Sequence, residues 1–339
     1  MFNPAATSIR YCIKRLQTGY RQAFGQQQPA YAELIQQVAT LALETIAQTD
    51  ALYHDLEHTI LVTLVGQEIL RGKQILEGNV SASDWAHFVI SLLCHDLGYV
   101  KGVCSQDDVA AGEYITGVAD DRIRLPEGAT DAGLTGCHID RGKRCVAEIF
   151  EHQPLLDLDR LQHHIELTRF PVPQDELHRD TTGYPGLARA ADLIGQLSDP
   201  CYLKKIPALF YEFEEMGTNQ RMGYRHPGDL RVGFPSFYRN VVLKYIQSGM
   251  GYLAATPKGK RILESLQANV EAAAEPVSFT TPPAVLRQLF SAIEPSPSKF
   301  PSPPSQSSVG IASTSFRLSQ PMDWGEPQLT LSCRLASAF

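Results

Sequence analysis

Apolar residues recur at helical spacing over most of the chain between Tyr31 and Ala274. In the segments Tyr31 to Gln48 and Thr59 to Leu76 they fall three and four positions apart, which places them on one face of a helix. The same spacing predicts further helices over Trp85 to Cys94 (with Asp84 as N-cap), Ile139 to Phe150, Leu161 to Thr168, Leu187 to Leu197, Leu203 to Glu215, Phe237 to Gln247, and Gly259 to Ala273. No run of alternating apolar and polar residues predicts a strand. The pattern therefore indicates an all-α fold.

The periodic segments divide the chain into three parts. An N-terminal extension covers residues 1–30, and a helical domain covers residues 31–274. After Ala274 prolines alternate with serines, a composition that sustains neither a helix nor a packed core. Residues 275–339 are therefore expected to form a Pro/Ser-rich linker and a disordered tail, in which one apolar stretch, Val285 to Ile293, is a candidate for docking onto the domain.

The amino-acid composition of the chain argues against some classes of binding partner. Hydrophobic residues make up 43% of the chain and charged residues 20%, which is typical of a soluble globular protein. The net charge of −7 leaves no basic surplus for a nucleic-acid polymer, whereas a small anion needs only a local cluster of cations. No apolar run approaches the roughly 20 residues that span a bilayer. The seven cysteines form no CxxC pair and are expected to be reduced, which favours a cytoplasmic protein that does not bind membranes.

Four residues with metal-binding side chains stand out in the predicted helices. They are His58, the adjacent pair His95 and Asp96, and Asp192. The pair follows the apolar run FVISLLC, and Asp192 interrupts an apolar helix, so both carboxylates are expected to be buried. A buried charge needs a partner, and a cation is a suitable one. Two imidazoles and two carboxylates suit Mn, Mg, Fe or Zn and the hydrolysis of a phosphate ester.

Other polar residues are candidates for the surroundings of this site. His54 and His58 lie four positions apart, which predicts that they share one helical face. Arg141 and Lys143 follow His138 closely, and Arg169 follows a helix expected to pass near the site. These three cations are candidates for binding a substrate phosphate through charge-assisted hydrogen bonds, and the alternative for each is a solvated helix face.

In their order and helical setting, the residues His58, His95-Asp96 and Asp192 resemble the HD-domain metal-dependent phosphohydrolase superfamily, over roughly Tyr31 to Gln247. The resemblance implies a helical bundle with one divalent ion on His58, His95, Asp96 and Asp192. It also implies that Asp96 takes part in catalysis, and that the substrate is a small nucleotide-like phosphate ester.

Within that superfamily, the segment YHDLEH resembles the YHNxxH motif of cyclic nucleotide phosphodiesterases. This resemblance implies that His58 binds metal and that His54 is the general acid for the leaving oxygen. The phosphodiesterases hold their purine between a glutamine and a phenylalanine three residues later. In this chain Phe234 matches the phenylalanine, and Arg231 stands at the position of the glutamine.

Two further positions differ from the phosphodiesterase pattern, because Tyr99 replaces the second histidine of HDxxH and Asp55 replaces the asparagine of YHN. A second ion would need other ligands, for which His138, His163 and His164 are candidates. A cyclic nucleotide phosphodiesterase is the first hypothesis. The alternatives are a nucleotide phosphomonoesterase or pyrophosphohydrolase, a catalytically inactive HD-domain sensor or regulator, and an oxidative di-iron enzyme.

Overall fold

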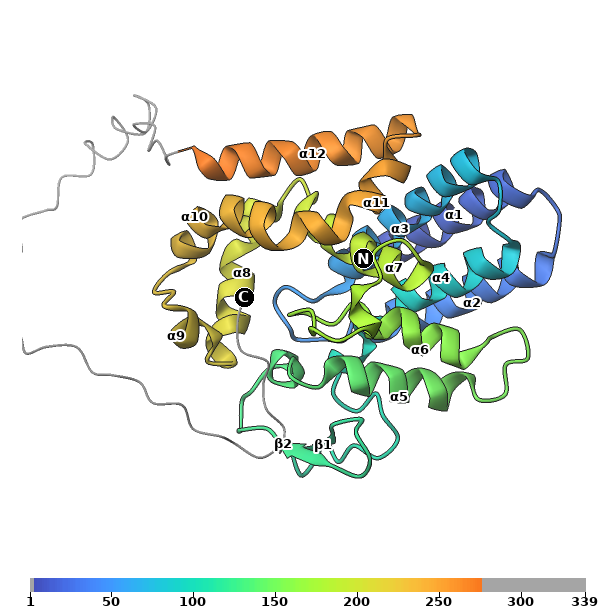
Figure 1. Cartoon of the computed structure of the whole chain (residues 1–339). Coiled ribbons are helices and arrows are strands. Elements are labelled where there is room, and N and C mark those ends of the chain that lie inside the picture. The colour runs from blue at the N-terminus through green and yellow to red at the C-terminus, as the bar shows by residue number, and fades with distance from the viewer. Residues whose placement is uncertain (1–2, 276–339) are drawn as a thin grey trace, which may run out of the picture. The chain divides into compact units, whose positions relative to one another are not determined.

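Helices form almost all of the regular structure in residues 3–275, the part of the chain that the computed structural model describes (Figure 1). The α-helices are α1 (Pro4–Phe24), α2 (Pro29–Ile46), α3 (Leu56–Glu77), α4 (Ala82–Cys94), α5 (His138–Phe150), α6 (Leu158–Glu166), α7 (Tyr184–Leu197), α8 (Tyr202–Glu215), α9 (Thr218–Met222), α10 (Pro227–Phe237), α11 (Leu243–Leu253) and α12 (Pro257–Ala274). The 3-10 helices are η1 (Leu97–Tyr99), η2 (Asp131–Leu134) and η3 (Leu177–Arg179), and η4 (Tyr238–Val242) is a π-helix. The predicted all-α class is confirmed.

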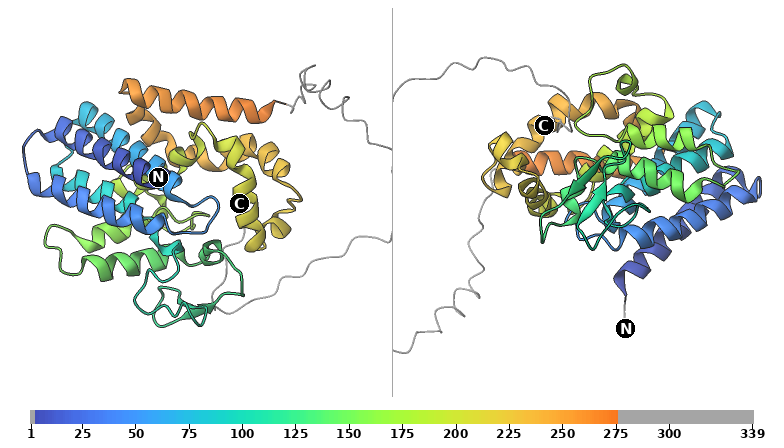
Figure 2. Two further views of the ribbon diagram at one scale, coloured as in Figure 1. Left: turned by 180° about the vertical axis from the view of Figure 1, so that it is seen from behind. Right: turned by 90° about the horizontal axis from the view of Figure 1, so that it is seen from below.

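Helix α3 lies at the centre of the helical packing. It contacts α1, α2, α4, α7, α11 and α12, and buried residues occur along most of its length. Figure 2 shows these helices from two further directions. Helices α5 and α6 pack against each other, and α6 also contacts α4 and α7. Helix α10 contacts α8 and α12. Helices α3 and α7, which carry His58 and Asp192, and α4, which ends just before His95 and Asp96, are therefore neighbours in the core.

The N-terminal segment belongs to the same compact unit as the rest of residues 3–275. Helix α1 buries Ile9, Cys12, Leu16 and Tyr20, and it packs on α2 and α3. The predicted N-terminal extension, residues 1–30, thus contains a helix of this unit, whose apolar residues are interrupted by many polar ones. In the structure these few apolar residues suffice to attach α1 to the core.

Local sequence explains where several helices begin. Ser81 accepts a hydrogen bond from the backbone N–H of Asp84, and the Asp84 carboxylate accepts one from the N–H of Ser81. This capping box makes Ser81 the N-cap of α4, and Asp84 is the third helical residue rather than the predicted cap. Prolines occupy the first turn of α1, α2, α7, α10 and α12, where a missing N–H leaves no helical hydrogen bond unmade.

One short hairpin departs from the predicted absence of strands. Strands β1 (Glu113–Ile115) and β2 (Arg122–Arg124) pair antiparallel, with Tyr114 opposite Ile123. Strands of three residues are too short to produce a visible alternation in the sequence. Beyond Glu275, the predicted Pro/Ser-rich tail and the stretch Val285 to Ile293 lie outside the described residues. No helix within the described residues is both long and apolar enough to cross a membrane.

Close helix packing predicts opposite effects for two glycine substitutions. A Cβ at Gly72 of α3 would lie 1.9 Å from the carbonyl oxygen of Tyr252 in α11, whereas a Cβ at Gly251 of α11 meets open space. We expect Gly72→Ala to lower the free energy of unfolding by about 1–3 kcal/mol, because the backbone of α11 must move. Gly251→Ala is expected to raise it by about 0.5–1 kcal/mol through helix propensity. Urea unfolding measures both, and equal stability of the two variants would contradict this packing.

Candidate metal centre

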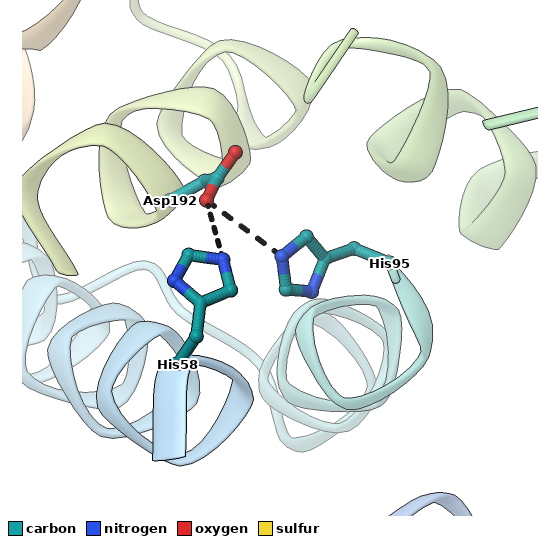
Figure 3. A group of neighbouring side chains, drawn as sticks. All are labelled: His58, His95 and Asp192. Atoms are coloured by element: carbon teal, nitrogen blue, oxygen red, sulfur yellow. Dashed lines mark ion pairs between the residues drawn. The ribbon is translucent and has the colours of Figure 1, made fainter. Parts of the chain in front are cut away.

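The compact group at the centre of the site consists of His58, His95 and Asp192. One possible ligand atom from each lies within 4.8 Å of the others, and Figure 3 shows both imidazoles directed toward the Asp192 carboxylate. The Oδ1 atom of Asp192 is 3.4 Å from Nε2 of His58 and 3.7 Å from Nε2 of His95. These three predicted ligands are thus brought together by α3, the end of α4, and α7.

Local hydrogen bonds orient the two histidines. Asp55 is the N-cap of α3 and accepts a hydrogen bond of 3.0 Å from the backbone N–H of His58. Asp55, which replaces the asparagine of the YHN pattern, therefore begins the helix. Nδ1 of His95 is bonded to the carbonyl oxygen of Leu92 at 2.8 Å, which makes Nδ1 the protonated nitrogen in the neutral ring. Nε2 of His95 is then left with a lone pair.

Asp96 contacts both imidazoles without joining the compact group. Its Oδ2 lies 3.3 Å from Nε2 of His58 and 3.2 Å from Nε2 of His95. The side chains of Asp96 and His95 are almost completely buried, and neither Oδ2 of Asp96 nor Nε2 of His95 has a hydrogen-bond partner. Leaving two buried polar atoms unpaired is costly, and a cation between them would remove that cost. The donor set therefore fits a divalent ion.

The pKa values of His58, Asp192 and Asp96 also favour a cation at this position. Burial lowers the pKa of His58, but the adjacent carboxylates of Asp192 and Asp96 outweigh burial and raise it to about 10. Burial raises the pKa of Asp192, yet the two histidines hold it at about 2. The pKa of Asp96 is likewise held far below its ordinary value by the imidazoles, against the effect of burial. Both carboxylates are thus charged and require positive charge beside them.

His54 lies outside the helix that carries His58, contrary to the prediction of a shared helical face. Helix α3 begins at Leu56, and His54 precedes the cap. Its ring nevertheless lies 5.5 Å from the His58 ring, centroid to centroid. Nδ1 of His54 is 2.6 Å from Oε2 of Glu212, a residue of α8 that is 3% exposed. Burial lowers the pKa of His54, but Glu212 more than offsets this and raises it.

Glu212 was not identified from the sequence. Its Oε1 also accepts hydrogen bonds from the backbone N–H groups of Tyr53 (2.7 Å) and His54 (3.2 Å), so one carboxylate fixes both the ring and the backbone of His54. In the sequence, Glu212 is one of three acidic residues in the aromatic segment LFYEFEEMG, and nothing distinguishes it from the other two. The pairing joins positions 158 residues apart, which local patterns do not reveal.

Tyr99, which replaces the histidine of the HDxxH pattern, is stacked between two rings. Its ring centroid lies 4.7 Å from that of His54 and 4.3 Å from that of His138. Nδ1 of His138 bonds to the carbonyl oxygen of Thr135 at 2.7 Å, and Nε2 lies 3.9 Å from Oδ1 of Asp96. Burial lowers the pKa of His138 to about 4, so the ring is neutral at pH 7.

The other two histidine candidates for a second ion lie elsewhere. His163 is exposed on α6, and His164 is buried with Nδ1 3.0 Å from the hydroxyl of Ser91. The only group of three or more potential ligands found among the described residues is His58, His95 and Asp192, and it includes neither. Of the three candidates, His138 alone adjoins the site.

The predicted phosphate-binding cations are engaged by other groups. Arg141 is fully buried, and its guanidinium binds both carboxylate oxygens of Asp107 at 2.9 Å and the carbonyl oxygens of Gly98, Val100 and Ile115. The prediction that Arg141 binds substrate is therefore wrong, because this side chain fixes the loop that follows η1. Lys143 and Arg169 each form ion pairs with both Asp140 and Glu166. Neither side chain lines the cavity beside the candidate ligands.

That cavity opens between the candidate ligands and the helices α7, α8 and α10. Its volume is about 140 Å³. His54, His58, Asp96 and Asp192 line its polar end, and apolar and aromatic residues make up most of the remainder. Phe234 is in this wall, and its ring centroid lies 4.9 Å from that of Tyr202. Arg231 does not line the cavity but bonds to the carbonyl oxygen of Ala272.

The sequence matches the family described as Npun_R2479-like over residues 2–275, and the chain belongs to this family. The matched region ends where the described helical unit ends, so the family and the fold have the same extent. No curated protein and no solved structure matches the chain. The functional argument therefore depends on the site itself.

The ion-pair network beside the site predicts a pH-dependent stability. Burial raises the pKa of Glu166, but Arg169 and Lys143 outweigh burial and lower it to about 2. Because an unfolded glutamate titrates near pH 4.3, the carboxylate stabilises the fold fully above about pH 5 and progressively less as the pH falls toward 2. We expect Glu166→Gln to lower the free energy of unfolding by about 1–3 kcal/mol at pH 7 and by about half as much at pH 3.

Denaturant unfolding at the two pH values measures this difference. The exposed Glu264 provides the control, since Glu264→Gln is expected to leave stability within about 0.5 kcal/mol of the unmodified protein at both. A Glu166→Gln effect that is the same at pH 3 and pH 7 would show that the charge is not the cause.

Proposed function

We propose that this protein is a metal-dependent hydrolase of phosphate esters, with a small phosphodiester as its leading substrate class. The observation that carries the proposal is the buried group His58, His95 and Asp192, beside which Nε2 of His95 and Oδ2 of Asp96 lack partners. The resemblance to the HD-domain superfamily supports the same assignment, because it names these residues as ligands. Mixed nitrogen and oxygen ligation suits Mn, Fe, Mg or Zn.

His58, His95 and Asp192 hold the ion, and Asp96 is the adjacent carboxylate that completes the charge balance. A divalent ion at this position supplies Lewis acidity toward a phosphoryl oxygen and toward water. The residues around it exclude bulk water, since His58, His95 and Asp96 are each less than 5% exposed. Because little water is present to screen the charges, the attraction between the bound ion and a phosphate is stronger.

His54 is the general acid of the proposed reaction. Glu212 binds its Nδ1 at 2.6 Å, which leaves Nε2 as the nitrogen available to a substrate in the cavity. The neighbouring carboxylate favours the imidazolium form, from which a proton passes to the departing oxygen. Stacking on Tyr99 fixes the plane of the ring. This arrangement of general acid, orienting carboxylate and ion supports hydrolysis over simple ligand sensing.

Metal binding is the first test of the proposal. We expect isothermal titration of the full chain with Mn²⁺ to show one ion per chain and a rise in melting temperature that a chelator reverses. His95→Ala and Asp192→Asn are expected to weaken binding at least about 10- to 100-fold, because each removes a ligand. His163→Ala is the matched control on an exposed histidine and is expected to bind normally. Normal binding by His95→Ala would contradict the site.

Catalysis is tested with bis-p-nitrophenyl phosphate and added Mn²⁺. We expect His54→Ala to lower kcat about 10²- to 10⁴-fold, and Glu212→Gln about 10- to 100-fold, with Mn²⁺ affinity unchanged in both. The control is Glu214→Gln, an exposed position on the same helix, which is expected to retain kcat within twofold. Turnover that survives His54→Ala would remove the general acid from the mechanism. Tight metal binding without turnover of any phosphate ester would favour the sensor or regulator instead.

A further inference from the structure

We propose that the substrate is a singly charged phosphodiester carrying a hydrocarbon group, aromatic or branched aliphatic, that fills the apolar end of the cavity. This inference rests on the proposed hydrolase function and specifies the substrate class of the same site. It differs from the nucleotide-like substrate that the resemblance implied. Three features of the cavity carry it: the composition of the wall, the small number of polar groups beyond the site, and the balance of charge.

Beyond the candidate ligands, the cavity wall is built mainly from apolar side chains of three helices. Helix α7 contributes Leu193 and Leu197, α8 contributes Ile206, Leu209 and Phe213, and α10 contributes Leu230, Phe234 and Phe237. The aromatic rings of Phe170 and Phe237 meet edge to face at 5.8 Å, which closes one side. Such a wall stabilises a bound hydrocarbon group through the hydrophobic effect and does not pair with polar groups.

Few polar side chains line the cavity away from the candidate ligands. Gln196 and Tyr202 are two of them, and the ring of Tyr202 packs against that of Phe234 with the centroids 4.9 Å apart. Tyr224 and Thr168 are the other polar residues in this part of the lining. A nucleobase has several donors and acceptors along its edge, and each one buried without a partner weakens binding. The wall therefore favours a hydrocarbon group over a base.

The charges at the site balance without a substrate. Asp96 and Asp192 together carry two negative charges, which one divalent ion neutralises, and His54 pairs with Glu212. Among residues 3–275 no lysine or arginine lines the cavity, and Lys143 and Arg169 are each engaged by carboxylates. A phosphate with two or more negative charges would find no side chain to neutralise the excess. A diester, with one negative charge, places the smallest demand on the site.

The test uses phosphinates, which have two P–C bonds and are not hydrolysed. Diphenylphosphinate and dimethylphosphinate carry the same single charge and differ only in hydrocarbon. Isothermal titration of the full chain loaded with Mn²⁺ is expected to show diphenylphosphinate binding at least about 30-fold more tightly, with a negative heat-capacity change. Phenylphosphonate, which carries up to two charges, and the slowly hydrolysed adenosine 3′,5′-cyclic phosphorothioate are both expected to bind more weakly than diphenylphosphinate.

Substitutions in the cavity wall test whether the preferred hydrocarbon group binds in this cavity. We expect Leu209→Asn to reduce the preference for diphenylphosphinate over dimethylphosphinate at least threefold, while Mn²⁺ binding stays unchanged. Leu41→Asn is the matched control, since Leu41 is 43% exposed on α2 and does not line the cavity. Mn²⁺ binding also shows that each variant is folded at the site.

The outcomes separate the two proposals. If the unmodified protein binds Mn²⁺ but does not distinguish the two phosphinates, or prefers the cyclic nucleotide analogue, the substrate class is wrong and the metal site stands. If the unmodified protein binds no Mn²⁺, the hydrolase proposal fails and this inference fails with it. If Leu209→Asn leaves the preference intact, the hydrocarbon does not occupy this cavity.

Discussion

Two imidazoles and two carboxylates face one another in the interior of the helical domain, and their burial requires positive charge between them. The packing of α3 against α4 and α7 brings the imidazole nitrogens to within 3.2–3.7 Å of the carboxylate oxygens. Protons on the histidines supply part of that charge, which is why the pKa of His58 is raised. A divalent ion supplies it more completely, because it also pairs the buried atoms of His95 and Asp96 that lack hydrogen bonds.

The surroundings of the site follow from the same constraint. Asp55 begins α3 so that His58 lies in its first turn, and the Leu92 carbonyl selects the His95 tautomer that leaves Nε2 for a ligand. Glu212 reaches the site from α8 and holds His54 beside the cavity. The nearby cations, by contrast, are used within the protein. Arg141 supports the loop after η1, while Lys143 and Arg169 are paired with Asp140 and Glu166. The site thus combines a polar end with an apolar wall.

The sequence was informative where a local pattern determines the structure. Helical periodicity identified most of the helices, and carboxylates in apolar helices indicated the candidate ligands, because burying a charge constrains its partners strongly. The sequence was uninformative where the partner of a side chain is a residue far away in the chain. Glu212 is indistinguishable in the sequence from Glu214, and only the fold pairs it with His54. Arg141 resembled a phosphate ligand because its partner, Asp107, lies 34 positions away.

The most direct test of the account is a crystal structure of the protein grown with Mn²⁺, with data collected to detect anomalous scattering from manganese. The account predicts one strong anomalous peak within bonding distance of Nε2 of His58, Nε2 of His95 and the carboxylate of Asp192. A structure of the same crystals with no peak at this position, or with its peak only at a surface residue such as His163, would contradict the central claim.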